Sequence, residues 1–131
     1  MITTLHRFSM NIYIPLSWTI LLLVLLLMPG SSIPTTNVYA IPNIDKVAHF
    51  ILFGGLIFWW GVYFRSRIEN GRWSVRVWTL IFYAIMLGAV IECVQLAFIP
   101  NRDFDLVDIA ANSLGALISG LGLIFFYHKS Y

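Results

Sequence analysis

Charged residues are scarce in this chain of 131 residues: Asp, Glu, Lys and Arg make up only 11% of it, against about 25% in an average soluble domain. Hydrophobic residues account for 60% of the chain, and the mean hydropathy is +0.84. A soluble domain of this size has too little interior to bury so much apolar surface. The composition therefore excludes an ordinary soluble protein and predicts an all-α membrane protein.

Cysteine is almost absent, because Cys93 is the single cysteine in the sequence. One cysteine cannot form a disulfide within the chain. Stability must therefore come from packing within the lipid. The length allows one compact domain, and we expect residues 1–131 to form it.

Long runs without charge define the predicted helices. A transmembrane helix needs about 20 mostly apolar residues, and four such runs occur, interrupted by Pro29, Arg65 and Pro100. The sequence therefore predicts a polytopic bundle of four transmembrane helices, with spans of about 12–28, 45–64, 77–99 and 104–127. The first run has a competing interpretation as a cleaved signal peptide, since Arg7 precedes it and residues 38–40 resemble a cleavage site.

The positive charges indicate an orientation. The segment between the second and third spans contains Arg65, Arg67, Arg72 and Arg76, with Glu69 as its only acid. Short loops rich in Lys and Arg stay on the cytoplasmic side. We therefore predict a multi-pass protein of the cell membrane with both termini in the cytoplasm. The arginines are interpreted as membrane anchors, and no nucleic-acid partner is expected.

Polar side chains gather at the opposite, extracytoplasmic ends of the last three spans. At a rise of 1.5 Å per residue, Glu92 and Asn112 should lie about 12 Å below their helix ends. Ionisable groups at membrane depth are usually paired inside a bundle and functional. Helical spacing places the polar side chains of each of these three spans along one face of its helix, so we expect one shared cleft open to the outside. The candidate residues are Asp45, Lys46, His49, Glu92, Gln95, Arg102, Asp105, Asp108 and Asn112.

Structural interpretations of the same residues remain open. A network of polar side chains can simply hold helices together in lipid. Acids near a helix N-terminus are stabilised by its dipole, and Asn101 and Asp103 are interpreted as turn and cap residues of the last helix. The series Ala111, Gly115 and Ser119 would allow close packing between helices.

The order and spacing of the polar segments resemble the VanZ-like family. The resemblance spans about residues 44–120 and rests on DKVAHF at 45–50, ECVQ at 92–95 and RDFDLVDIAANSLG at 102–115. It implies a small integral membrane protein of the kind linked to resistance against teicoplanin, a glycopeptide antibiotic with a lipid tail. The recurring residues of the family would be the candidate residues above together with Gly115.

These patterns favour one function and leave others open. The favoured function is binding or modulation of a lipidated or lipid-linked envelope ligand in the polar cleft, with membrane lipid or such a component as partner. The alternative is a membrane-embedded, metal-dependent hydrolase or transferase acting on lipid-linked substrates. An ion path is a third interpretation, although the cytoplasmic halves of the helices are apolar. No resident metal or cofactor is expected, catalytic residues cannot be assigned, and the oligomeric state is left open.

Overall fold

The computed structural model describes residues 11–29, 32, 43–67 and 72–128. These residues form the helices α2 (Tyr13–Leu27), α3 (Ile44–Arg65), α4 (Trp73–Phe98) and α5 (Leu106–His128), and no strand occurs among them. The predicted all-α class is confirmed. Each helix begins and ends within four residues of the predicted span; the largest difference is at the start of α4, at Trp73 rather than 77.

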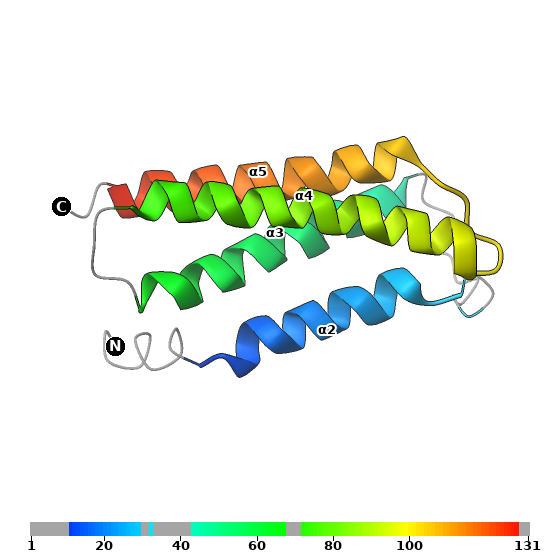
Figure 1. Cartoon of the computed structure of the whole chain (residues 1–131), viewed down its shortest axis with the longest axis horizontal. Coiled ribbons are helices and arrows are strands. Elements are labelled where there is room, and N and C mark those ends of the chain that lie inside the picture. Colours follow the sequence, from blue (N-terminus) through cyan, green and yellow to red (C-terminus); the bar gives the residue numbers. More distant parts are fainter. Residues whose placement is uncertain (1–10, 30–31, 33–42, 68–71, 129–131) are drawn as a thin grey trace.

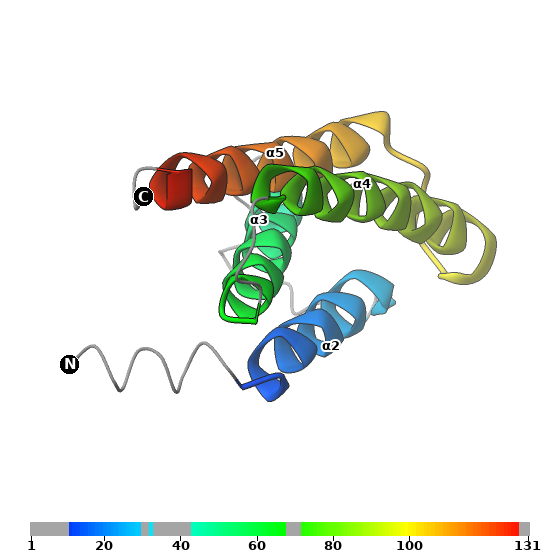
Figure 2. The same cartoon turned by 60° about the vertical axis from the view of Figure 1, so that its left-hand side comes forward.

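The helices run alternately up and down the length of the molecule (Figure 1). Contacts are most extensive between α3 and α5, followed by those between α4 and α5, whereas α2 packs mainly on α3. Figure 2 shows that α3 crosses behind the pair formed by α4 and α5. The start of α3, the end of α4 and the start of α5 therefore meet at one end of the bundle.

Three of the described helices are long and apolar enough to cross a membrane: α3, α4 and Leu106–Tyr127 of α5. Helix α2 is shorter, with 15 residues, and spans about 22 Å against a hydrocarbon core of about 30 Å. A fourth crossing therefore stays a prediction. The signal-peptide interpretation rests on Arg7 and residues 38–40, which lie outside the described residues.

Glycines bring α3 and α5 into backbone contact. A methyl group on Gly115 would collide with the carbonyl oxygen of Phe50 and lie 3.1 Å from the nitrogen of Gly54. Substitution there would force the two helices apart. Of the predicted small residues of α5, Gly115 therefore packs against α3, which is separated from α5 in the chain by α4.

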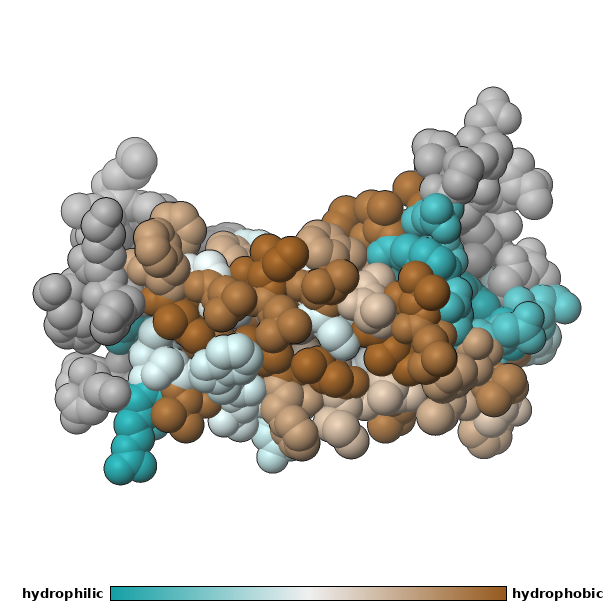
Figure 3. Space-filling view, turned by 90° about the horizontal axis from the view of Figure 1, so that it is seen from above, coloured by the Kyte–Doolittle hydropathy of each residue, from teal (hydrophilic) through white to brown (hydrophobic). Residues whose placement is uncertain are grey.

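The surface matches a membrane environment. Large apolar side chains such as Phe82 (59% exposed) and Ile118 (59%) point outward, and brown apolar side chains dominate the middle of Figure 3. Hydrophilic side chains gather at the right-hand end, where α3 and α5 begin. At the other end, the Arg65 guanidinium lies over the rings of Trp73 and Tyr127, 5.8 and 5.4 Å from their centroids.

Candidate functional site

A buried group of polar side chains lies where α3, α4 and α5 meet. His49 comes from α3, Glu92 from α4, and Asp108 and Asn112 from α5. Their exposed fractions are 1%, 0%, 6% and 0%. We call these four residues with Asp45, Lys46 and Asp105 the polar cluster. Helical spacing correctly indicates that these residues come together, although they span more than sixty positions of the chain.

Lys46 connects the carboxylates at the outer edge of the polar cluster. Its ammonium donates to Asp105 at 2.8 Å and to Asp45 and Asp108 at 3.2 Å each. The side chains of Asp45 and Asp105 are 49% and 38% exposed, and that of Lys46 is 23% exposed. The Lys46 hydrogen bond holds the pKa of Asp105 below its ordinary value. The Lys46 ammonium thus connects the exposed carboxylates of Asp45 and Asp105 to the nearly buried carboxylate of Asp108.

Asp105 joins α4 to the start of α5. Its backbone N–H donates to Glu92 Oε2 at 3.2 Å, and its Oδ1 accepts the N–H of Val107 at 2.8 Å. The second bond is that of an N-cap residue. The prediction that Asn101 and Asp103 are turn and cap residues of this helix is therefore correct for the turn at Asn101 and wrong for the cap. Asp105 is the cap, and α5 begins at Leu106 instead of 104. Asn101 lies in the preceding turn with φ 59°, a left-handed conformation that asparagine tolerates.

His49 is oriented by Asn112. The ring nitrogen Nδ1 lies 3.0 Å from Asn112 Oδ1. An amide oxygen can only accept, so Nδ1 is the donor, and a neutral ring then carries its lone pair on Nε2. Nε2 lies 3.8 Å from Asp108 Oδ2 and has no hydrogen-bond partner within the described residues. The ring is therefore fixed on one side and unsatisfied on the other.

Glu92 is satisfied on one side only. Its Oε1 lies 4.0 Å from His49 Nδ1 and has no hydrogen-bond partner in the described part of the chain. A buried polar atom without a partner costs about 1–3 kcal/mol, and more when it is charged. One ligand atom from each of His49, Glu92 and Asp108 lies within 4.8 Å of the others. Such a set of nitrogen and oxygen atoms is suited to a divalent cation.

Two candidate residues lie apart from the hydrogen bonds of the polar cluster. Gln95 is 1% exposed, and its Nε2 donates to the carbonyl oxygen of Leu26 at 2.7 Å. That carbonyl belongs to the last turn of α2, where it has no intrahelical partner. Among the described residues, no ion pair or hydrogen bond involves Arg102. Gln95 thus links α4 to α2, and Arg102 lies in the α4–α5 turn.

Gly88 and a backbone amide complete the site, and sequence reasoning assigns neither role. A methyl group on Gly88 would lie 2.9 Å from Asn112 Nδ2, too close for an undisturbed neighbour. Gly88 therefore makes the space in which the Asn112 amide sits. The sequence feature that could have indicated this role is the position of Gly88, one turn before Glu92 on the same face of α4. The Asp105 N–H that binds Glu92 leaves no signal in the sequence, because every residue except proline has such a group.

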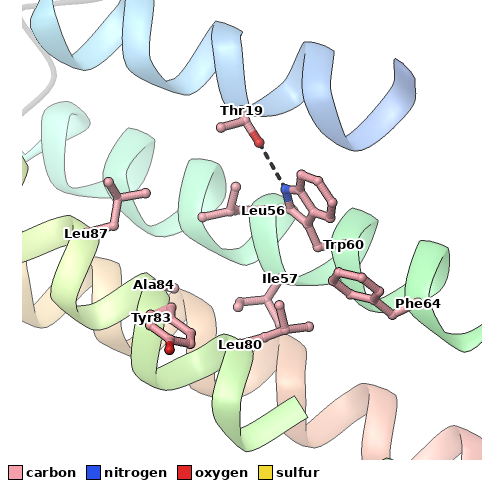
Figure 4. Close-up of a pocket in the computed structure, with 9 residues that line it drawn as sticks. All are labelled: Thr19, Leu56, Ile57, Trp60, Phe64, Leu80, Tyr83, Ala84 and Leu87. Atoms are coloured by element: carbon pink, nitrogen blue, oxygen red, sulfur yellow. Dashed lines mark hydrogen bonds between the residues drawn. The ribbon is translucent and has the colours of Figure 1, made fainter. Parts of the chain in front are cut away.

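An apolar groove lies between α2, α3 and α4, towards the middle of the bundle (Figure 4). Its volume is about 300 Å³. Trp60 Nε1 donates to Thr19 Oγ1 across it at 3.0 Å. The other lining residues are Leu56, Ile57, Phe64, Leu80, Tyr83, Ala84 and Leu87. Its size and chemistry suit a hydrocarbon chain.

The comparison with protein families gives one match. The VanZ/LLP1 family matches residues 2–127, which extends beyond residues 44–120 of the sequence resemblance and includes α2. No curated protein and no solved structure matches the chain. Because the match covers nearly the whole sequence, the chain belongs to the VanZ/LLP1 family.

Proposed function

We propose that this membrane protein acts in the bacterial cell envelope by binding the polar head of a lipidated or lipid-linked molecule at the polar cluster. The observation that carries the proposal is a set of buried atoms of the polar cluster that have no partner among the described residues, next to exposed carboxylates: His49 Nε2, Glu92 Oε1 and Asn112 Nδ2. Buried polar atoms in folded proteins are nearly always hydrogen-bonded. A ligand that supplies the missing partners accounts for them.

The charges of the polar cluster favour a particular kind of head group. Asp45, Asp105 and Asp108 face the single ammonium of Lys46, and Glu92 adds a fourth carboxylate beside His49. An excess of acceptors selects ligands rich in amines, amide N–H groups and hydroxyls. A lipoglycopeptide such as teicoplanin combines peptide amides and sugar hydroxyls with a lipid tail. A glycolipid precursor of the cell wall has the same combination.

The apolar groove of Figure 4 supports an amphiphilic ligand. Leu56 lies seven residues beyond His49 on α3, and Leu87 five residues before Glu92 on α4. At 1.5 Å per residue these positions are about 10 and 8 Å from the polar cluster along the helices. An acyl chain can therefore lie along the groove while its head is held at the cluster. Binding would bury apolar surface and hydrogen-bond the head group at once.

The distribution of arginine supports an extracytoplasmic location of the polar cluster. Arg65, Arg67, Arg72 and Arg76 lie at the end of the bundle away from the cluster. The positive-inside rule puts that end in the cytoplasm. Envelope ligands would therefore reach the cluster from outside. This orientation is what allows a role in resistance to an antibiotic that acts outside the membrane.

Hydrolysis or group transfer on a lipid-linked substrate is the second candidate function. The grouping of His49, Glu92 and Asp108 favours it, because these side chains are suited to a catalytic metal. No nucleophile is assigned for such a reaction. Turnover of lipid-linked phosphates by the purified protein would support this alternative.

Growth inhibition by teicoplanin and vancomycin tests the proposed function. A sensitive host would express the wild type, Asp108→Asn or the matched control Asp103→Asn, with membrane abundance measured by blotting. Asp103 is exposed, and no hydrogen bond or ion pair found among the described residues involves it. We expect the wild type and Asp103→Asn to raise the inhibitory concentration of teicoplanin but not of vancomycin, and Asp108→Asn to lose the effect. Equal effects of all three proteins, or none from the wild type, would contradict the proposal.

A further inference from the structure

We propose that His49, Glu92 and Asp108 bind one divalent transition-metal ion, Mn²⁺ or Zn²⁺, between α3, α4 and α5. The site lies within the polar cluster, but the inference does not rest on a lipid-linked ligand. It rests on which polar atoms of the three side chains are hydrogen-bonded to the protein and which are not. His49 and Glu92 each have one polar atom bound to the protein and one without a partner among the described residues, and Asp108 has one oxygen bound by Lys46.

The bound atoms hold the three side chains in place. Glu92 Oε2 accepts the backbone N–H of Asp105 at 3.2 Å, and Asp108 Oδ1 accepts from Lys46 at 3.2 Å. His49 Nδ1 donates to Asn112 at 3.0 Å. Each partner thus fixes the direction of a side chain without using the atom that would bind a metal.

The free atoms lie close to the His49 ring, and Glu92 Oε1 is 4.0 Å from its Nδ1. His49 Nε2 and Glu92 Oε1 have no hydrogen-bond partner among the described residues, although both residues are at most 1% exposed. Asp108 Oδ2 lies 3.8 Å from His49 Nε2, and the three residues each offer a ligand atom within 4.8 Å of the others. Ligands of one zinc ion lie about 2.0–2.2 Å from the metal. Small rotations of the side chains would bring the atoms to that distance.

The tautomer of His49 agrees with a metal ligand. Because Nδ1 donates to Asn112, the lone pair of the neutral ring is on Nε2, directed toward the Asp108 carboxylate. A lone pair beside a carboxylate is unfavourable unless a proton or a metal cation lies between them. Metal-bound histidines almost always donate their other N–H to an oxygen acceptor, which fixes the tautomer and raises ligand basicity. Asn112 supplies that acceptor.

The charge and ligand types select the ion. Asp45, Asp105 and Asp108 share the ammonium of Lys46, and the Glu92 carboxylate lies beside His49. A divalent cation would offset the remaining negative charge. Ca²⁺ and Mg²⁺ favour sites built of oxygen ligands alone. One imidazole with two carboxylates instead suits Mn²⁺ or Zn²⁺. Three protein ligands also leave a coordination position open.

Metal binding by the purified full-length protein in detergent tests the inference directly. The protein would be stripped with a chelator, dialysed and titrated with MnCl₂ or ZnCl₂, with no lipid-linked ligand present. Calorimetry would measure binding of both ions, and electron paramagnetic resonance would follow Mn²⁺. We expect one saturable equivalent per chain for at least one ion. Absence of saturable binding of both ions to the folded wild type would overturn the inference, whatever the outcome of the drug tests.

Variants locate the ion. Glu92→Gln and Asp108→Asn should weaken binding at least tenfold, whereas Asp103→Asn should bind like the wild type. Circular dichroism would verify that each variant is folded. A rise in melting temperature with added metal, present in the wild type and reduced in Glu92→Gln, would support the assignment through linkage of binding to folding. Unchanged affinity in both folded site variants would place the ion elsewhere and overturn the assignment.

Discussion

His49 Nδ1 and Asn112 Oδ1 form a hydrogen bond of 3.0 Å that joins α3 to α5 inside the bundle. Both residues are at most 1% exposed. A hydrogen bond between two helices could serve packing alone. Here it also fixes the ring so that Nε2 is directed toward Asp108. The pair therefore links the stability of the helix contact to the geometry of the polar cluster.

Replacing Asn112 should separate these two roles. Asn112→Ala removes the acceptor for His49, and loss of such a partner usually lowers metal affinity about 10–100-fold. Asn112→Asp keeps an oxygen acceptor and should retain metal binding. Calorimetric titration with Mn²⁺ and Zn²⁺ would measure both variants. If folded Asn112→Ala bound metal as tightly as the wild type, Asn112 would not position the ring.

Helix packing can be tested at two glycines of α5. Gly115→Ala places a methyl group against the Phe50 carbonyl, whereas a methyl group on Gly122 meets nothing within 4 Å. Overpacking of this kind typically costs about 1–3 kcal/mol. We expect a clearly lower melting temperature for Gly115→Ala in detergent and little change for Gly122→Ala. Equal melting temperatures of the two variants would contradict the described α3–α5 contact.

The Asp105–Lys46 ion pair predicts a pH dependence. The hydrogen bond from Lys46 lowers the pKa of Asp105 in the folded protein, against about 3.9 when unfolded. The folded state therefore binds fewer protons in this range, and the stability contribution is complete above pH of about 4 and lost as the pH falls through the lowered pKa.

Asp105→Asn is the matched variant for this test, because asparagine can still cap α5 and the backbone N–H to Glu92 is retained. The wild type should melt at a higher temperature than Asp105→Asn at pH 6. That difference should shrink as the pH falls below about 4. A difference that stays constant from pH 6 to pH 3 would show that ionised Asp105 does not stabilise the fold.

Gln95 should matter for packing rather than for ligand binding. Its amide donates to the Leu26 carbonyl at the end of α2, and Gln95→Leu would leave that carbonyl without its partner at a cost of about 1–3 kcal/mol. We expect a lower melting temperature but unchanged metal affinity. Thermal denaturation and calorimetry on the same preparation would measure the two effects. A loss of metal binding in folded Gln95→Leu would place Gln95 in the site.

Much of the fold could be predicted because membrane insertion imposes strong length and polarity constraints. The long, mostly apolar runs define α3, α4 and α5 to within a few residues. The common location of His49, Glu92 and Asp108 could also be predicted, since depth and helical face depend only on residue spacing. These regularities are properties of the helix itself.

Individual partners could not be predicted in the same way. Spacing places Gln95 on the stripe of Glu92, yet its amide reaches α2 because the crossing of the helices decides which neighbour each residue meets. Asp105 rather than Asp103 caps α5, because the backbone of the turn decides where the first helical N–H groups lie. The three potential metal ligands stand out from the larger polar set only through their distances.

Direct binding of teicoplanin to the purified protein in lipid nanodiscs tests the central claim most directly. Isothermal titration would compare the wild type with Glu92→Gln, which preserves shape and removes one buried carboxylate, using vancomycin as the ligand without a lipid tail. The account predicts saturable binding of teicoplanin to the wild type, at least tenfold weaker binding to Glu92→Gln and weaker binding of vancomycin to either protein. Equal binding of teicoplanin to the two folded proteins would contradict a ligand site at the polar cluster.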